Sequence, residues 1–151
     1  MLDRFERFSI AVFEIMRCWH KIAGDEMKAY GLKGAHATYL TTMYRFEDGI
    51  NATQLCELCG KDKADASRML SIMEKKGLVT RENTGRSLYR ALLKLTEEGK
   101  AVAEHVQERV RVAVESAGKG ISEGERTTFY NALEMIAANL QALSKEGLPN
   151  T

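Results

Sequence analysis

The stretch INATQLCELCGKDKADASRMLSIMEKKGLV, residues 50–79, contains the signals for two short helices separated by a tight turn. Asn51 is followed three residues later by Gln54, a capping-box pattern that predicts a helix beginning after Asn51. Gly60 can adopt the left-handed conformation that commonly ends a helix. The first helix is therefore expected to end at Gly60 and to be only about two turns long.

A second helix is expected from Asp62 to about Lys76. The Asp62 carboxylate can accept a hydrogen bond from a free backbone N–H of the first turn, and Gly77 can end the helix. The apolar residues recur at helical spacing and predict one buried face: Ala66, Met69, Leu70 and Met73, with Leu78 just beyond. Two helices joined by a tight turn around Gly60 and Lys61 form the outline of a helix-turn-helix.

Beyond Gly77 the hydrophobic period changes from that of a helix to that of strands. LVTRE (78–82) and LYRALLKL (88–95) are predicted strands, and the polar segment NTGRS (83–87) between them contains Gly85 as a turn residue. A two-stranded hairpin directly after a helix-turn-helix is a winged-helix arrangement. The sequence therefore predicts a mainly α fold, a winged helix-turn-helix with a two-stranded β wing.

Two helices are predicted before this region. The first is expected to run to about Tyr30, where Gly31 can end it. Its apolar residues are spaced by threes and fours and form one stripe: Leu2, Phe5, Phe8, Val12, Ile15, Trp19, Ile22 and Ala23. The second is expected over Ala35–Phe46. Its predicted inward positions are Tyr39, Leu40, Met43 and Phe46.

Two further helices are predicted after the wing. Thr96 can cap a helix from Glu97 to about Ala117, with an apolar stripe at Val102, Val106, Val110 and Val114. Ser122 and Glu125 form a second capping box at the start of the last helix. That helix repeats apolar residues at alternating steps of four and three, a heptad seam: Phe129, Leu133, Ile136, Leu140 and Leu143.

These elements suggest a division of the chain within one compact unit. Residues 35–96 are expected to form the winged helix-turn-helix, which would be the DNA-binding region. Residues 1–34 and 97–151 are expected to form a helical dimerisation region. The apolar stripes of three long helices exceed what one small core can cover, which favours packing against a second copy in a two-fold dimer. An intramolecular helical bundle is the alternative.

Composition and charge narrow the function. The chain has 151 residues, 44% hydrophobic and 28% charged, as in globular proteins. No apolar run approaches the roughly 18 residues that span a bilayer, and the first ten residues carry a charge every few positions, so we expect a cytoplasmic protein without a membrane partner. The net charge is only +1, but the charges are unevenly distributed. Lys61–Lys94 holds nine basic and four acidic residues, whereas the rest of the chain holds thirteen basic and seventeen acidic residues. This basic middle favours an anionic partner such as nucleic acid, with chance clustering as the alternative.

The segment from Ile50 to Glu82, together with LKLTEEGK (93–100), resembles the MarR family of bacterial transcriptional regulators. The most specific parts are Ser67-Arg68, Glu74–Val79 and Leu95-Thr96 with Gly99. The likeness in order and spacing covers nearly the whole chain. It implies a homodimer with intertwined terminal helices, two winged-helix lobes on a pseudo-palindromic operator in double-stranded DNA, and often a small-molecule or redox signal that releases the DNA. On this basis we expect a sequence-specific repressor and not an enzyme.

A recognition helix that enters the major groove N-terminus first offers its early residues to base edges. Lys63, Ala64 and Asp65 are then nearest the bases, and Ser67 and Arg68 are the strongest candidates for contacts to phosphates or bases. Lys61 can reach the DNA backbone, and Thr53, at the start of the preceding helix, could bind a phosphate. For Asp65 the favoured alternative is a charge in the first turn that complements the helix dipole. A solvated first-turn residue is the alternative for Thr53.

The predicted wing departs from the commonest form of the family, which has Asp-x-Arg at its tip. Here the tip is NTGRSLYR, without Asp. Arg86 is the favoured minor-groove residue because Gly85 beside it fits the tip of a turn. Ser87 and Arg90 complete the expected wing contacts.

Four residues are candidates for a small-molecule effector pocket. Met16, Trp19, Tyr39 and Met43 could line a cleft between the dimerisation helices and the DNA-binding region, where effectors of this family commonly bind. The same residues could equally be ordinary core, which is the favoured interpretation. An effector pocket at this position is therefore a hypothesis that depends on the resemblance.

The cysteines and histidines give weaker signals. Cys56 and Cys59 share one helix face, but the sequence supplies no further pair of zinc ligands nearby, so packing in the core is favoured over a metal or redox site. Cys18, near Arg17 and Lys21, is a minority candidate for a redox-sensing thiol. The three histidines are expected to be structural. We expect no cofactor, no metal and no catalytic residues. A redox-sensing regulator of the same fold and a winged-helix protein-interaction adaptor are the alternative functions.

Overall fold

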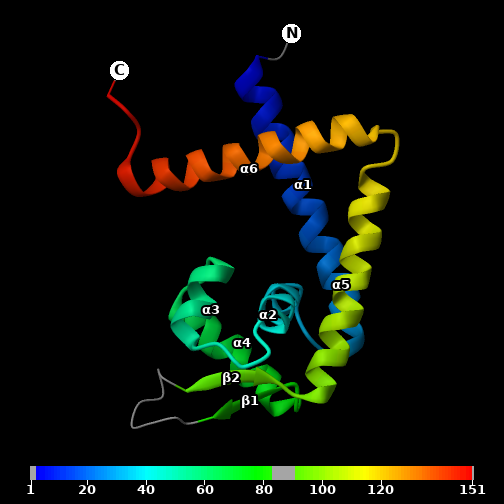
Figure 1. Ribbon diagram of the computed structural model, residues 1–151, viewed down its shortest axis with the longest axis vertical. Helices are drawn as coiled ribbons and strands as arrows, with labels where there is room; N and C mark the ends of the chain where they lie inside the picture. The colour runs from blue at the N-terminus through cyan, green and yellow to red at the C-terminus, as the bar shows by residue number, and fades with distance from the viewer. Residues whose placement is uncertain (1–2, 83–90, 151) are drawn as a thin grey trace. The chain divides into compact units, whose positions relative to one another are not determined.

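The computed structural model describes residues 3–82 and 91–150. Its elements, drawn in Figure 1, are α1 (Arg4–Met27), the 3-10 helix η1 (Lys28–Tyr30), α2 (Ala35–Tyr44), α3 (Ala52–Cys59), α4 (Lys63–Lys75), β1 (Val79–Glu82), β2 (Leu92–Leu95), α5 (Glu97–Ala117) and α6 (Glu123–Glu146). The chain divides into two compact units, Met1–Val110 and Arg111–Thr151. The predicted fold class is confirmed: a mainly helical chain with a helix-turn-helix and a two-stranded antiparallel wing base.

The helix-turn-helix is bounded by the predicted caps. The Asn51 side chain accepts from the Gln54 N–H at 2.8 Å, and the Gln54 side chain completes the capping box. The Asp62 carboxylate accepts from the Asp65 N–H at 2.7 Å and so begins α4. Gly60, with φ of 62°, ends α3 in the left-handed conformation that only glycine adopts without strain. The local sequence thus fixes the ends of α3 and the start of α4.

The outer helices follow their predicted bounds with two differences. The last turn of the first helical segment tightens into η1 before Gly31, whose φ is 64°. The inward position predicted for Phe46 is wrong, because α2 ends at Tyr44 and the Phe46 side chain, beyond it, is 36% exposed. The second capping box, Ser122 with Glu125, is confirmed at the start of α6.

The core of the first unit is built around α2. In that core α2 packs against α1, α3 and β2, while α4 packs against α3 and β1. The largest fully buried apolar side chains come from every one of these elements except β1 and from the connection before α3: Met27, Tyr39, Leu40, Met43, Ile50, Leu55, Leu70, Met73 and Leu93. Each such apolar side chain contributes roughly 1.5–3 kcal/mol by its removal from water. The orientation of α4 therefore depends on burial of its apolar face.

The base of the wing is joined to the connection between α2 and α3. β1 and β2 pair antiparallel, with Val79 opposite Leu95 and Glu82 opposite Leu92. Ile50 adds an isolated bridge to Leu93, with N···O distances of 3.0 and 2.9 Å in the two directions. A single residue has no strand pattern in the sequence, so this pairing was not predicted.

A close contact connects the wing base to α5. The Leu78 carbonyl oxygen accepts from the Thr96 N–H at 3.0 Å, and the Thr96 hydroxyl donates to the Gly77 carbonyl at 2.6 Å. Thr96 also caps α5 as predicted, accepting from the Gly99 N–H at 3.0 Å. A Cβ at Gly99 would overlap the Leu78 carbonyl oxygen, which is rigid main chain. Position 99 therefore has no room for a side chain.

The second unit contains the end of α5 and the whole of α6. Arg126 in α6 donates to the Gly118 carbonyl and to the Glu115 carboxylate, both at 3.0 Å, and so fastens the turn between the two helices. α6 buries none of its residues within the described chain. The predicted seam lies on its surface: Phe129, Leu133, Ile136 and Leu140 are exposed and Leu143 is half-buried. In the described ranges, no helix combines the length and apolar character needed to cross a membrane.

Gly99→Ala is expected to lower the free energy of unfolding by roughly 1–3 kcal/mol, the usual cost of overpacking. The matched control is Gly24→Ala, in the last turn of α1, where an added Cβ meets nothing within 4 Å. This control should raise stability by up to roughly 0.5–1 kcal/mol, because alanine favours a helix more than glycine does. Urea denaturation of both variants measures the difference. Equal stabilities of the two variants would contradict the close-approach argument.

Candidate nucleic-acid interface

The outward face of α4 carries most of the predicted DNA contacts. Lys63, Ala64, Ser67 and Arg68 are all exposed. The opposite face is buried, at Ala66, Leu70 and Met73. The helical period of 3.6 residues separates the two sets, because i and i+4 lie on one side. The structure therefore brings these four predicted residues together on one exposed surface of a helix held by its other side.

Two further predicted contacts outside the wing, Lys61 and Thr53, are also exposed. Lys61 is exposed in the turn before α4, and its backbone N–H donates to the Cys56 carbonyl at 3.0 Å. Thr53 is exposed in the first turn of α3. Helix N-termini bear free N–H groups and a partial positive charge that attract phosphates. α3 and α4 both present charged or hydroxyl side chains close to such termini.

Asp65 differs from its neighbours on α4. Its carboxylate is half-buried, with 25% of the side chain exposed, and Oδ2 accepts from the Tyr39 hydroxyl at 3.0 Å. Its Oδ1 lies 3.7 Å from Nη2 of Arg68. Asp65 is thus engaged within the protein, in line with the structural alternative to a base contact. Sequence reasoning missed Tyr39 as its partner, because the two residues are 26 positions apart.

Ion pairs reduce the number of cations available for an anionic partner. Arg81 on β1 pairs with Glu74, and Lys94 on β2 pairs with Glu82 at 3.3 Å. Arg68, by contrast, is 71% exposed and has only the long contact to Asp65 among the ion pairs of the described chain. The predicted wing residues Arg86, Ser87 and Arg90 lie outside the described residues. Of Arg68, Arg81 and Lys94, Arg68 on the outward face of α4 is therefore the most accessible to an anionic partner.

A helix-turn-helix with a two-stranded antiparallel wing base and a basic exposed face on its second helix defines the winged-helix class. The model of the MarR family matches residues 30–87, which run from the end of η1 through α2, α3, α4 and β1. This part of the chain is similar to the MarR family.

Solved structures of regulators in this family share the fold. A MarR transcriptional regulator from Methanosarcina mazei Go1 is 23% identical, with a TM-score of 0.83 over 95% of this chain and 94% of that one. A MarR family regulator from Silicibacter pomeroyi is 26% identical, with a TM-score of 0.73 over 85% and 86%. A protein from Listeria monocytogenes described as a MarR family transcriptional regulator, complexed with 26mer DNA, is 23% identical, with a TM-score of 0.80 over 100% and 99%.

The four candidate effector residues occupy two different environments. Tyr39 and Met43 are buried in the core, 1% and 2% exposed. Met16 is exposed and Trp19 half-buried on α1, and neither belongs to the buried core cluster. An effector pocket formed by all four stays a prediction.

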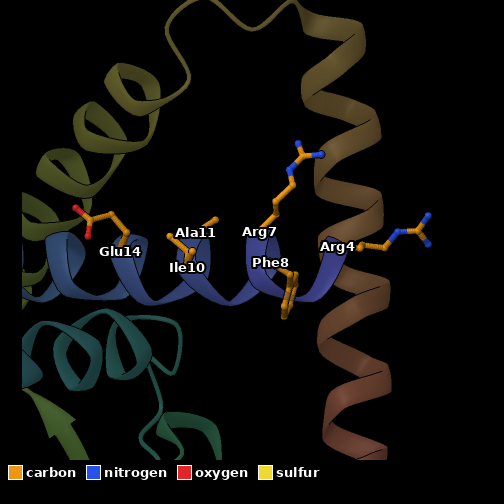
Figure 2. A pocket seen from close by; sticks show the side chains of 6 residues that line it. All are labelled: Arg4, Arg7, Phe8, Ile10, Ala11 and Glu14. Carbon is orange, nitrogen blue, oxygen red and sulfur yellow. The ribbon is translucent and has the colours of Figure 1, made fainter. Parts of the chain in front are cut away.

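An open hollow lies instead near the start of α1. Figure 2 shows the six residues that line it, all from α1: Arg4, Arg7, Phe8, Ile10, Ala11 and Glu14. Side chains from one helix cannot enclose a ligand, so this hollow is part of an exposed helix face. It includes none of the four candidate effector residues.

The cysteine pair Cys56 and Cys59 is packed in the interior. Cys56 is buried, and the half-buried Cys59 packs against the core, with Sγ 3.6 Å from the Thr42 hydroxyl oxygen. Burial raises the pKa of both thiols, which disfavours the reactive thiolate. Among residues 3–82 and 91–150, no group of three or more His, Cys, Asp or Glu side chains is placed to hold a metal ion.

Cys18 lies on the exposed surface of α1. Its Sγ is 3.9 Å from Nη2 of Arg17, the cation expected to activate it. Glu14 pairs with the same guanidinium at 2.6 Å and lies 3.7 Å from Sγ. A carboxylate thus offsets the positive charge beside this thiol.

His36 is the one histidine that is buried within the described chain. Its Nδ1 accepts from the Lys33 N–H at 2.9 Å, and its Nε2 makes no hydrogen bond of normal geometry in the described structure. Burial lowers the pKa of His36, while main-chain groups at Lys33 and Met69 oppose the shift. Of the neighbouring charges, Lys33 lowers the pKa further and Asp65 raises it. The neutral ring is therefore favoured in the folded protein.

The free energy of unfolding should fall as the pH is lowered from about 7.5 to about 5.5. Above about 6.5 the ring is neutral in both states; below that value the unfolded chain binds a proton more readily, which favours unfolding. Urea denaturation across this range measures the effect. His36→Gln should weaken the pH dependence, whereas His20→Gln, at an exposed site on α1, should retain it. The same pH dependence in the His36 variant would assign the effect to other groups.

Proposed function

We propose that this protein is a sequence-specific regulator of transcription of the MarR family, which binds double-stranded DNA. The observation that carries the proposal is the outward face of α4, with Lys63, Ser67 and Arg68 exposed behind a capped N-terminus. A helix of this kind fits the major groove, where its first residues meet base edges and its next turn meets phosphates. The Listeria monocytogenes protein of the same fold is complexed with DNA, which supports DNA as the partner. The proposed role is regulatory, not enzymatic.

We further propose that the protein is a homodimeric repressor, released from a pseudo-palindromic operator by a small ligand or another signal. Two exposed apolar faces support dimerisation, each within its own unit. α1 exposes Phe5, Phe8, Val12 and Ile15 of its apolar stripe, and α6 exposes most of its heptad seam. Apolar surfaces of this kind mark protein interfaces. A two-fold dimer would present two α4 helices to the two half-sites of an operator.

Selection of bound sequences from a random DNA pool tests the proposed function directly. The selected sequence should be bound more tightly than random DNA of the same length, and the affinity should fall steeply with salt because bound lysines and arginines displace counterions. Repeating the selection with candidate ligands would identify a releasing signal. A purified dimer with no DNA affinity even at low salt would instead favour a protein-interaction adaptor.

Arg68→Ala is expected to weaken binding to operator and random DNA alike, and to reduce the salt slope by about one, as expected for the loss of one phosphate contact. Lys63→Ala is expected to relax base preference at one position by roughly 1–3 kcal/mol, with a smaller change in the slope. Lys75→Ala, at the opposite end of α4, is the matched control and should change both quantities least. Fluorescence anisotropy across a salt series measures both. The same behaviour of the Arg68 and Lys63 variants would remove this division of roles.

Leu140→Glu is expected to weaken dimerisation roughly tenfold or more, because a carboxylate would be buried in the seam. Operator affinity should fall with it, since both half-sites must be bound together. Ala138→Glu adds the same charge on the opposite face of α6, where residues i and i+2 do not face each other, and should stay dimeric. Sedimentation measures the association state. A fully dimeric Leu140 variant would place the dimer interface elsewhere.

A further inference from the structure

A buried tyrosine of α2 reaches the recognition helix. Tyr39 is 1% exposed, and its hydroxyl donates to Oδ2 of Asp65 at 3.0 Å. The other carboxylate oxygen of Asp65, Oδ1, lies 3.7 Å from Nη2 of Arg68. One half-buried carboxylate therefore connects the core to the exposed guanidinium on the outward face of α4.

The chemistry of these groups determines which of them donates and which accepts the hydrogen bond. Burial and the neighbouring Asp65 raise the pKa of Tyr39, so the phenol keeps its proton and stays a donor. A tyrosine in a core needs a partner for its hydroxyl, and a carboxylate accepts more strongly than a neutral group. Asp65 is consequently held toward α2 and away from the surface that would meet phosphates.

The position of Asp65 affects Arg68 in two ways. An arginine side chain on a helix surface has many rotamers, and fixing one of them before binding reduces the entropy lost on binding. A carboxylate held beside the guanidinium supplies that restraint. A carboxylate released toward the DNA would instead repel phosphates and compete for Arg68.

We propose that Tyr39 and Asp65 are positioning residues for DNA recognition: Tyr39 fixes the Asp65 carboxylate, and Asp65 orients Arg68. The inference rests on the proposed DNA-binding function. It assigns Asp65 a role inside the protein rather than at a base edge. It also gives Tyr39, a core residue, an effect on affinity for operator and random DNA alike, because Arg68 is the proposed phosphate contact.

Tyr39→Phe keeps the ring and removes only the hydroxyl. Affinity for operator and random DNA is expected to fall alike, by roughly three- to thirtyfold, within the range for residues coupled in one hydrogen-bonded network. In an Arg68→Ala background the same change should have little further effect, because Tyr39 acts through Arg68. A residue with a purely structural role would lower binding equally in both backgrounds. The comparison is therefore a double-mutant cycle measured by anisotropy.

Tyr44→Phe is the matched control. Tyr44 lies on the same helix and also donates to a carboxylate, Oε1 of Glu104 at 2.8 Å, but that carboxylate belongs to α5. Loss of this hydroxyl should leave affinity for operator and random DNA unchanged. A similar loss in both tyrosine variants would overturn the proposal.

Asp65→Asn is a second test of the proposal, and it leaves the buried apolar side chains unchanged. The amide oxygen can still accept from Tyr39, but the negative charge beside Arg68 is removed. Substitution of Arg68 by alanine should then cost less DNA affinity than it does in the wild type, because Arg68 is no longer held in place. Unchanged DNA affinity in Tyr39→Phe, or equal effects of either substitution with and without Arg68, would overturn the inference. A wild-type protein that selects no sequence over random DNA would overturn the proposed function itself, and the inference with it.

Discussion

Burial of the inner face of α4 is the constraint on which the rest of the molecule depends. Leu70 and Met73 are anchored in a core to which α1, α2, α3 and β2 contribute. Because side chains on a helix have fixed angular positions, this anchoring determines which residues of the same helix point outward. The exposed set on α4 is therefore a consequence of core packing. The caps at Asp62 and Gly77 define the length of helix that the core must hold.

Local signals made much of this fold predictable. Asn51, Asp62, Thr96 and Ser122 each accept from a backbone N–H three residues later, and such short-range bonds can be recognised from residue spacing alone. Phe46 shows the limit of periodicity: its spacing matches the buried stripe, but the helix ends before it. The strand-like pairing of Ile50 depends on a partner 43 positions away and has no local pattern. Non-local contacts of this kind cannot be inferred from spacing.

The candidate interface was predictable in outline and not in its interactions. Helical spacing placed Lys63, Ser67 and Arg68 on one surface. Counting charges could not show that Arg81 and Lys94 are paired with neighbouring acids, since those pairs form across elements or strands. Asp65 was recognised as atypical for a DNA-facing position. The reason, a hydroxyl supplied from α2, needed the three-dimensional structure.

The contact between Gly99 and Leu78 bears on how this protein can diverge. Any side chain at position 99 collides with main chain, so drift at that site is restricted to glycine whatever the DNA target. Positions 63 and 64, by contrast, are exposed, and substitutions there leave the core intact. Mutations that change the recognised sequence are thus separated from mutations that break the scaffold. The fold can accumulate new specificities on the surface of α4 while the junction between wing and α5 stays invariant.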